Sequence, residues 1–572
     1  MLEGSSDVKK IWLENYPPGV PAEVDLHAYS SIPDVLEQAF SRFSALPAYS
    51  NLGSSMSYAQ VEAASRRFGA YLQHALGYAK GDRVAIMLPN VLQYPVVLFG
   101  ILRAGLVAVN VNPQYTPAEL EHQLKDSGAK AIVVLENFAH TVQQVLERNV
   151  DLNLTVFTTE IGDMLPLLQE VATNLAVKYV KKMVPAWRIP GSIELNAALR
   201  AGNEFNLTQV PLSLTDLAFL QYTGGTTGIA KGAMLTHGNL VANLQQVGAW
   251  LAGDLKDGEE VFVCPLPLYH IYALTSMLLF AKLGAHTVLV TDPRNAPAFL
   301  HDLRKYRFTT MIGVNTMYRA LMDAPGFGDV DFSSLKLSSS GGMAVQRVVA
   351  ERWAKATGVP LVEGYGLTET SPVAISNPVT IESWTGTIGL PIPSTEAAIM
   401  DDDGNPMPPG EVGEICIRGP QVMAGYWNRP DETAKVFTAD GWLRTGDMGV
   451  MDEQGWFRIT DRKKDMIIVS GFKVFPNQIE DVVAMHPGVL EVAAIGVADE
   501  RSGEAVMLVV VRRDPELTEA ALLEHCRAKL TGYKVPRLVE FRTEPLPKSN
   551  IGKILRRQLR EPAPQVAEKL AA

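Results

Sequence analysis

Short apolar runs alternate with stretches of helical character in the first quarter of the chain. The runs have the length of strands and are almost entirely apolar, at residues 83–88, 107–111 and 130–135. Between them lie a helical stretch at 94–103 and a helix start at Thr116, where Pro117 and Glu119 complete the pattern of a capping box. Such alternation is typical of a parallel sheet covered by helices on both faces. The sequence therefore predicts an α/β fold.

The texture changes twice in the second half of the chain. Between about 395 and 460, turn clusters separate short alternating runs, which predicts antiparallel hairpins. Beyond a charged cluster at 461–465 we expect a smaller αββαβ set, with a helix at 476–485, a strand at 506–511 and a helix at 517–530. A length of 572 residues suits two or three domains. We place the domains at 1–461 and 462–572.

Composition excludes several classes of protein. With 47% hydrophobic and 20% charged residues the chain can bury a large core, so wholesale disorder is excluded. Its three cysteines, Cys264, Cys416 and Cys526, lie far apart, which argues against a disulfide scaffold or a structural zinc site. A net charge of −11 argues against nucleic acid as a partner.

The localisation expected from the sequence is cytoplasmic. The first residues contain an early acid and lack the apolar core of a secretory signal. The longest uncharged stretch, 261–281, is long enough for a membrane span, but two prolines, a tyrosine and a histidine interrupt it. It reads better as a buried strand, a turn and a core helix. Peripheral attachment to the inner face of the cell membrane is compatible with the mean hydropathy of +0.06.

The sharpest local pattern is a glycine- and threonine-rich segment at 222–232, directly after an apolar run. Glycines leave backbone N–H groups free to surround an anion, threonines add hydroxyl donors and a lysine adds positive charge. It is not a Walker A loop, because Gly232 rather than Ser or Thr follows Lys231. A flexible surface loop is the plain alternative. The candidate phosphate-binding residues are Thr223, Gly224, Gly225, Thr226, Thr227, Gly228 and Lys231.

This segment resembles the phosphate loop of the adenylate-forming superfamily, usually Y-T-S-G-T-T-G-x-P-K-G. Gly224 stands for the serine and Ala230 for the proline, a variant similar to that of bacterial long-chain fatty-acyl-CoA ligases. Six motifs, this segment among them, stand in the family's order over nearly the whole chain. The resemblance implies a large N-terminal domain of two parallel-type sheets with helices and a small β-barrel-like subdomain. A small, mobile α+β C-terminal domain would follow.

The resemblance also implies roles for the segment 363–369. Tyr365, flanked by Gly364 and Gly366, would stack on adenine, Thr368 would contact the α-phosphate as a catalytic group, and Glu369 would bind Mg²⁺. The chemistry agrees, since adenine needs a flat partner and Mg²⁺ needs hard oxygen ligands near phosphate. An ordinary glycine-rich turn is the alternative for this segment alone. Thr226 of the phosphate loop is the second expected metal ligand.

Further nucleotide contacts are implied in the last quarter of the chain. Asp447 would accept hydrogen bonds from both ribose hydroxyls, while Ile459 and Arg462 would hold ribose or phosphate. Lys464 matches the family's hinge, and Lys553 matches its catalytic lysine. Outside this resemblance, the plain alternatives are a turn aspartate, a solvated charge cluster and a surface lysine.

CoA and acyl contacts complete the set of implied site residues. Gly471 would line the tunnel for the pantetheine arm of CoA, with Lys473 nearby. His270, with a catalytic role beside the substrate carboxylate, would border the acyl pocket together with three other residues, although a core histidine is a fair alternative. The other acyl-binding residues expected are Val314, Gly341 and Gly342.

The function implied is ATP-dependent activation of a long-chain fatty acid, with Mg²⁺ as cofactor and with ATP and CoA as co-substrates. The acid becomes acyl-AMP with release of pyrophosphate, and the CoA thiol then takes the acyl group and releases AMP. The nearest alternative is an acyl-AMP ligase that loads a carrier protein. A luciferase-like oxygenase and a non-catalytic membrane fatty-acid carrier are more distant ones. A homodimer is compatible with the sequence.

Overall fold

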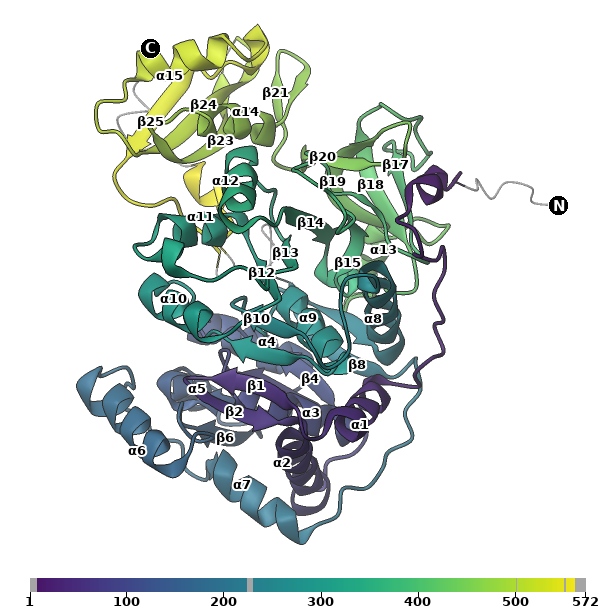
Figure 1. The fold of residues 1–572 in the computed structure, drawn as a ribbon, viewed down its shortest axis with the longest axis vertical. Coiled ribbons are helices and arrows are strands. Elements are labelled where there is room, and N and C mark those ends of the chain that lie inside the picture. Colours follow the sequence, from purple (N-terminus) through teal and green to yellow (C-terminus); the bar gives the residue numbers. More distant parts are fainter. Residues whose placement is uncertain (1–7, 224–229, 500, 550–551, 561–572) are drawn as a thin grey trace, which may run out of the picture.

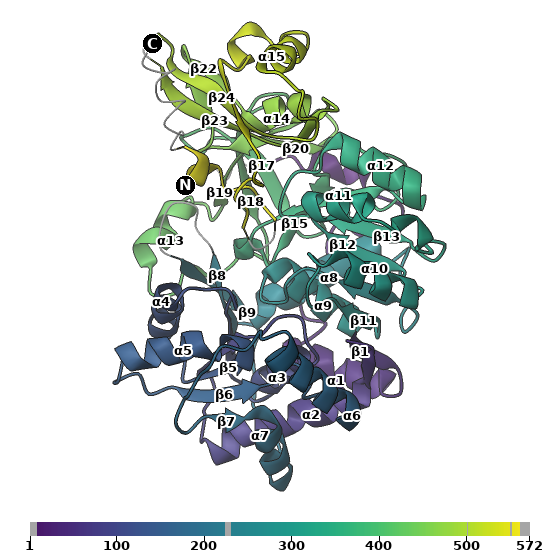
Figure 2. The same cartoon turned by 90° about the vertical axis from the view of Figure 1, so that its left-hand side faces the viewer.

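The computed structural model describes residues 8–223, 230–499, 501–549 and 552–560. Two large sheets with helices form most of the molecule, and the C-terminal region sits at one end of it (Figure 1). A view turned by 90° shows the same order of layers along the long axis (Figure 2). Within the described residues, no helix is both long and apolar enough to cross a membrane.

The first sheet has seven strands in the order β7-β6-β5-β3-β4-β8-β9, parallel except for the antiparallel pair β8–β9. Its strands are β3 (Arg83–Met87), β4 (Val107–Asn110), β5 (Ala131–Leu135), β6 (Thr155–Thr159), β7 (Ile193–Glu194), β8 (Leu217–Thr223) and β9 (Lys231–Thr236). The helices between them are α3 (Gln93–Arg103), α4 (Pro117–Ser127), α5 (Glu136–Arg148), α6 (Leu167–Leu175), which continues as the π-helical turn η3 (Ala176–Val180), and α7 (Leu195–Ala201).

The second sheet has nine strands in the order β16-β15-β14-β13-β12-β10-β11-β1-β2 and is parallel from β14 to β1. Its strands are β1 (Pro47–Asn51), β2 (Ser54–Ser57), β10 (Val261–Cys264), β11 (His286–Leu289), β12 (Thr310–Gly313), β13 (Leu337–Ser340), β14 (Leu361–Gly366), β15 (Val373–Ser376) and β16 (Leu390–Pro391). The remaining helices around the two sheets are α1 (Ile32–Phe43), α2 (Tyr58–Ala70), α8 (His237–Leu251), α9 (Ile271–Lys282), α10 (Ala296–Lys305), α11 (Asn315–Asp323) and α12 (Arg347–Thr357).

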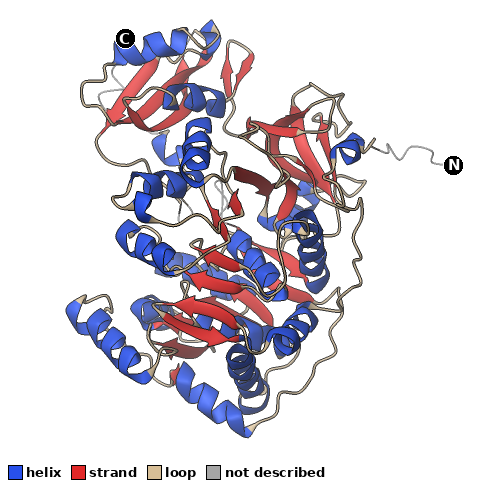
Figure 3. Cartoon of the chain, in the orientation of Figure 1, coloured by secondary structure: helices blue, strands red, loops and turns tan. Residues whose placement is uncertain are grey.

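The core lies in three apolar layers: one between the two sheets and one on the outer face of each sheet. In β3, Val84 and Ile86 pack into the largest apolar cluster, which also contains Phe262 of β10 and residues of α1, α3 and α9. Ala85 and Met87 face the other side and pack against α4 and α5. This alternation follows from the two-residue period of a strand. The layered order of blue helices and red strands is visible in Figure 3.

The antiparallel hairpins and the capping box are confirmed. A four-stranded antiparallel sheet stands where the barrel-like subdomain is expected, in the order β17-β18-β19-β20. Its elements are β17 (Glu396–Met400), β18 (Gly413–Arg418), α13 (Pro430–Val436), β19 (Leu443–Met451) and β20 (Phe457–Arg462).

Thr116 and Glu119 cap α4 reciprocally, as predicted. The uncharged stretch 261–281 is β10 followed by α9, as expected.

The C-terminal region is built on a five-stranded sheet, in which β25 pairs with β24. Its elements are β21 (Ile467–Val469), β22 (Phe472–Val474), α14 (Pro476–Ala484), β23 (Val489–Asp499), β24 (Gly503–Arg512), α15 (Glu519–Arg527) and β25 (Leu538–Arg542). The expected αββαβ set is present from α14 to β25, but the β21–β22 hairpin precedes it and was not predicted. The expected helix at 517–530 is shorter, and the expected strand at 506–511 is longer.

Candidate active site

Two cavities meet beyond the carboxyl ends of the parallel strands of the second sheet, where open α/β sheets usually bind ligands. The larger, about 1560 Å³, lies between the N-terminal region and residues 461–560. The smaller, about 420 Å³, is lined mainly by apolar side chains of α8, α9 and the sheet. The residues that line both cavities include Gly342, Gly364, Tyr365, Gly366, Arg462, Ser549 and Lys553.

A buried polar array joins two sheets at the larger cavity. The Tyr365 hydroxyl, at the end of β14, donates a hydrogen bond to Asp447 Oδ2 at 2.7 Å. Arg462 Nε lies 3.7 Å from Asp447 Oδ1, and the two residues are register partners in β19 and β20. Burial raises the pKa of the Tyr365 hydroxyl well above its usual value, so the phenol remains a donor. The structure thus brings three of the expected nucleotide-binding residues into contact.

Lys553 reaches this array from a turn near the C-terminus. The turn is closed by the Ser549 N–H donating to the Lys553 carbonyl at 2.7 Å and the Lys553 N–H donating to Ser549 Oγ at 3.2 Å. Burial, joined by the positive charge of Arg462, lowers the pKa of the Lys553 ammonium to about 7. Among the described residues the ammonium has no hydrogen-bond or ion-pair partner. A cation held in this way has strong unsatisfied affinity for a negative charge.

Gly552 brings this turn close to α11. Its φ of +81° lies in the left-handed region that favours glycine, and its carbonyl accepts a hydrogen bond from Thr316 Oγ1 at 3.4 Å. A Cβ at this position would lie 2.5 Å from Thr316 Oγ1, well inside contact distance. Gly552 therefore permits the docking that places the adjacent lysine in the cleft.

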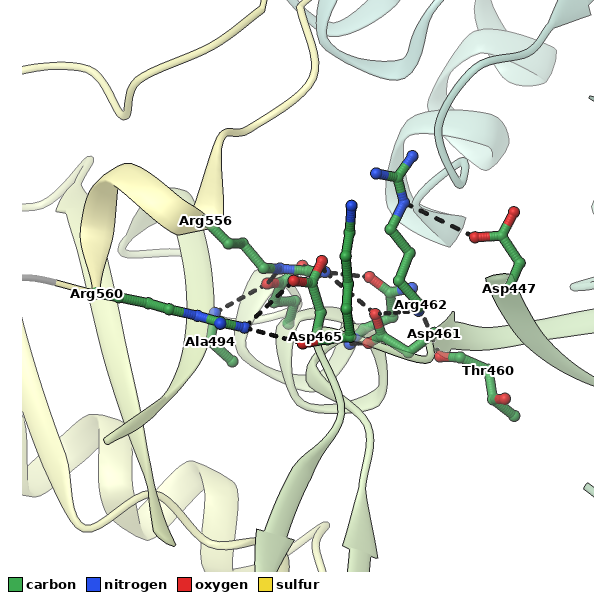
Figure 4. A network of polar contacts seen from close by, with 11 residues as sticks. Asp447, Thr460, Asp461, Arg462, Asp465, Ala494, Arg556 and Arg560 are labelled. Atoms are coloured by element: carbon green, nitrogen blue, oxygen red, sulfur yellow. Dashed lines mark hydrogen bonds and ion pairs between the residues drawn. The ribbon is translucent and has the colours of Figure 1, made fainter. Parts of the chain in front are cut away.

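Arg556 fixes the same segment to the rest of the C-terminal region (Figure 4). Its guanidinium makes ion pairs with Asp461 at 3.2 Å, Asp465 at 3.5 Å and Glu480 at 2.7 Å. Arg560 adds an ion pair to Asp465 at 3.3 Å. Burial raises the pKa of Asp461 to about 6. The Arg556 guanidinium provides the ion-pair partner of this fully buried carboxyl group. Residues 461–465 and 552–560 are thus held as one unit.

The expected phosphate loop is described only at its two ends. Gly224, Gly225, Thr226, Thr227 and Gly228 lie outside the described residues, while Thr223 ends β8 and Lys231 begins β9. Lys231 Nζ makes an ion pair with Glu432 Oε2 at 2.5 Å and lies 4.9 Å from the ring centroid of Tyr426. Thr223 lines the smaller cavity.

Glu369 offers one hard ligand at the same place. It lies beside Thr368 in the short turn η6 (Thr368–Thr370), lines the smaller cavity and accepts a hydrogen bond from the Tyr426 hydroxyl at 2.6 Å. The described residues contain no group of three or more histidine, cysteine, aspartate or glutamate side chains that could hold a metal alone. Mg²⁺ commonly takes one or two carboxylates together with substrate phosphates, so this single carboxylate fits it.

His270 lines the smaller cavity at the N-terminus of α9. Burial, with a smaller effect from the positive charge of Lys553, lowers the pKa of His270 to about 4, so the imidazole is neutral at pH 7. Its Nδ1 accepts the N–H of Tyr272 at 3.4 Å, which assigns the ring proton to Nε2. The ring is therefore a neutral donor at the end of an apolar cavity.

Two glycines shape the wall of the smaller cavity after β13. A Cβ on Gly341 would lie 3.1 Å from Tyr272 Cε1, and Gly342 has a φ of +77°. Val314, expected at the acyl pocket, is buried at the N-cap of α11 close to Gly552 and is not among the residues that line this cavity. The apolar lining includes Val247, Trp250, Ile271, Leu279, Phe280, Ile312 and Ile392.

The expected CoA residues lie away from this site. Gly471 and Lys473 are exposed in the β21–β22 hairpin, and a Cβ on Gly471, whose φ is +83°, would touch nothing within 4 Å. Neither residue lines either cavity. Ile459 and the expected hinge residue Lys464 line the larger cavity. The structure therefore presents Lys553, and not Gly471, to the cleft.

Four functional positions were missed from the sequence: Tyr426, Glu432, Gly552 and Arg556. Arg556 and its partner Asp461 are 95 positions apart, so no local spacing pairs them. Tyr426 and Glu432 contact Glu369 and Lys231 only through folding. The one available signal was the glycine directly before the motif lysine at 553.

Comparison with known proteins agrees with this geometry. The AMP-binding enzyme family matches residues 36–427, and the AMP-binding enzyme C-terminal domain matches 478–553. A long-chain-fatty-acid–CoA ligase of Escherichia coli is 56% identical over 97% of this chain and 99% of its own length. One from Yersinia pestis is 52% identical over 99% and 100%. The anthranilate CoA ligase AuaEII bound to anthranoyl-AMP has a TM-score of 0.81 at 26% identity, with 94% of this chain and 98% of that chain covered. The chain therefore belongs to the AMP-binding enzyme family.

Proposed function

We propose that this chain is an ATP-dependent ligase that converts a long-chain fatty acid to acyl-AMP and then transfers the acyl group to CoA. The observation that carries the proposal is the meeting of two cavities at Lys553: the larger contains the array of Tyr365, Asp447 and Arg462, and the smaller is lined mainly by apolar side chains. The relatives of 52–56% identity, named long-chain-fatty-acid–CoA ligases, support the substrate class.

The first step joins a carboxylate to the α-phosphorus of ATP while pyrophosphate leaves. Asp447 and Tyr365 position the nucleoside, since their hydrogen bond fixes both side chains at the cleft. Lys553 brings an unpaired positive charge to the oxygens on which negative charge accumulates. Mg²⁺ would be held by Glu369 with phosphate oxygens, and its charge would offset that of the triphosphate.

The fatty acid enters with its carboxylate toward this charge and its chain in the smaller cavity. Neutral His270 donates from Nε2 to a carboxylate oxygen without forming an ion pair that would hold the nucleophile back. Each buried CH₂ contributes about 0.8 kcal/mol, so a long chain supplies on the order of 10 kcal/mol of gross burial. One methylene more or less changes discrimination by only about 1–3 kcal/mol.

The second step requires room for the pantetheine arm of CoA. We propose that residues 462–572 form a mobile domain that turns about Lys464, so that Lys553 faces the site first and Gly471 second. The exposure of Gly471 in an open turn supports this, because the turn is unencumbered and outside the cleft while Lys553 is inside. Thr368 and the phosphate loop would guide the phosphates in the first step.

Separate assays of the two half-reactions test the domain alternation. Lys553→Ala should depress acyl-AMP formation by orders of magnitude yet still convert preformed acyl-AMP and CoA to thioester. Gly471→Leu should release pyrophosphate about once per site and then stall. If both variants depress both half-reactions equally, a single fixed site replaces the proposal.

Pyrophosphate release across C4 to C20 fatty acids, each with and without CoA, tests the substrate class. A ligase for long chains should turn over with long acids and free CoA. Turnover that needs a phosphopantetheinylated carrier in place of free CoA would instead indicate an acyl-AMP ligase. Because such acids partition into lipid, we also propose that the enzyme works at a membrane surface.

A further inference from the structure

The segment formed by α6 and η3 turns its apolar side chains outward. Leu168 is 87% exposed, Val180 79% and Leu167 73%. Val171, Leu175 and Tyr179 of the segment are also exposed, as is Met183 just beyond its end. Not one residue of α6 or η3 is buried. Leu167, Val171 and Leu175 recur at every fourth position of α6, so they form a stripe along one side of this helix, and Tyr179 and Val180 of η3 are exposed after it.

The inward side of the same segment is polar. Asn174 Oδ1 accepts the N–H of Gly162 at 2.8 Å, and Lys178 makes an ion pair with Glu136 at 3.2 Å. Gln169 makes hydrogen bonds to the hairpin of β1 and β2. A surface helix ordinarily packs its apolar face on the core and turns its polar face to water. This helix has the reverse orientation, which leaves a contiguous apolar face without a partner in the described chain.

Exposed cations follow directly after this segment. Glu170 is the one acid between residues 164 and 190, and of the four bases in that range Lys178 is paired inward with Glu136 and Glu160. Lys181, Lys182 and Arg188 are exposed, and their charged groups have no ion-pair partner among the described residues. Exposed leucine, valine and tyrosine bordered by unpaired lysines are the features of a helix that lies in the interface of an anionic membrane.

We propose that the outward face of α6 and η3 docks this protein onto an anionic lipid surface. The apolar stripe enters the boundary between headgroups and acyl chains, and Lys181 and Lys182 contact anionic headgroups. The segment lies at the end of the molecule opposite the C-terminal region, so docking leaves that region free to move (Figures 1 and 2). Docking itself does not depend on the proposed function. Only its benefit, access to a fatty acid dissolved in the membrane, rests on that function.

A second copy of the chain fits this face less well. A stable interface takes about 20–30 residues from each side, and the outward stripe is a single helical ridge within residues 167–183. The cations beside it would meet the same positive charge on an identical copy, whereas an anionic membrane supplies the opposite charge. Charge complementarity therefore favours lipid.

Flotation of the full-length protein with vesicles tests the proposal. We expect binding to phosphatidylcholine vesicles containing about one-third phosphatidylglycerol to exceed binding to pure phosphatidylcholine by at least about tenfold, and to weaken in high salt. The double variant Leu168→Glu, Val180→Glu should lose at least about tenfold. Lys181→Gln with Lys182→Gln should lose about fivefold per lysine on anionic vesicles only.

Matched controls keep the result decisive. Val348→Glu with Met485→Glu changes two apolar side chains that are exposed elsewhere, at 46% and 49%, and should bind vesicles like the wild type. Equal binding by the α6 variant and this control would overturn the proposal. So would a wild-type dimer that the α6 variant dissociates while its vesicle binding is unchanged.

A vesicle-free assay separates this proposal from the proposed function. Pyrophosphate release with the shortest acid that the wild type accepts should be the same in the wild type and the α6 variant, which also shows that the variant folds. Absence of release by the wild type with every acid from C4 to C20, with vesicle binding retained, would contradict the ligase assignment and support docking.

Discussion

The rate of acyl-AMP formation should fall at alkaline pH as Lys553 loses its charge. Its pKa of about 7 leaves about half of the free enzyme charged at pH 7, about a tenth at pH 8 and about a hundredth at pH 9. Because the charged form stabilises the phosphoryl oxygens, kcat/KM for ATP should approach a tenfold fall per pH unit above 7. The rate of pyrophosphate release in the absence of CoA measures this pH dependence, and it avoids a contribution from ionisation of the CoA thiol. Lys553→Arg keeps its charge in this range, so its profile should be lower and flat.

Two buried carboxyl groups titrate in the same window and have to be separated from the lysine. Burial raises the pKa of Glu363 to about 8 and that of Asp481 to about 7, and both side chains line the larger cavity. His270, at about 4, is already neutral throughout. Glu363→Gln and Asp481→Asn should therefore keep the fall in rate at alkaline pH. A fall that survives in Lys553→Arg but disappears in either carboxyl variant would show that the carboxyl group, and not Lys553, is the titrating group.

Three substitutions test other parts of the site. Asp447→Ala should raise KM for ATP more than KM for fatty acid and erase discrimination between ATP and its 2′- or 3′-deoxy analogues; unchanged discrimination would contradict the ribose role. Gly552→Val places a Cβ about 2.5 Å from Thr316 Oγ1 at a φ of +81°, so acyl-AMP formation should fall at least about tenfold while preformed acyl-AMP still reacts with CoA. Equal loss of both steps would count against a docking role. Gly341→Val crowds the Tyr272 ring, 3.1 Å from the new Cβ, so kcat/KM for long acids should fall more than that for short ones, and an unchanged ratio would exclude this wall from the acyl path.

Local rules account for much of the fold that could be predicted. The β3 run is apolar on both faces because Val84 and Ile86 meet one helical layer while Ala85 and Met87 meet the other. The Thr116 cap lies within four residues of its partner, so its signal is local. The β21–β22 hairpin also has a local signal that was not used, because the apolar run 466–469 and the mainly apolar run 472–475 flank the turn Ser470-Gly471.

Contacts between distant segments set the limit of sequence reasoning. The order of the motifs indicated that Asp447 and Lys553 serve one substrate, but their common cleft depends on how the C-terminal region docks. Arg556 finds its acidic partners only in the folded chain. The outward leucines of α6 show a further limit, because an amphipathic pattern does not say which face meets water.

In the proposed reaction the carboxylate attacks the α-phosphorus of ATP before CoA reacts. The direct measurement supplies a long-chain fatty acid with both carboxylate oxygens as ¹⁸O, together with ATP and CoA, and determines the label in each product by mass spectrometry. Attack at the α-phosphorus leaves one ¹⁸O in AMP and one in the thioester carbonyl. Unlabelled AMP, with the label in phosphate or pyrophosphate instead, would contradict it.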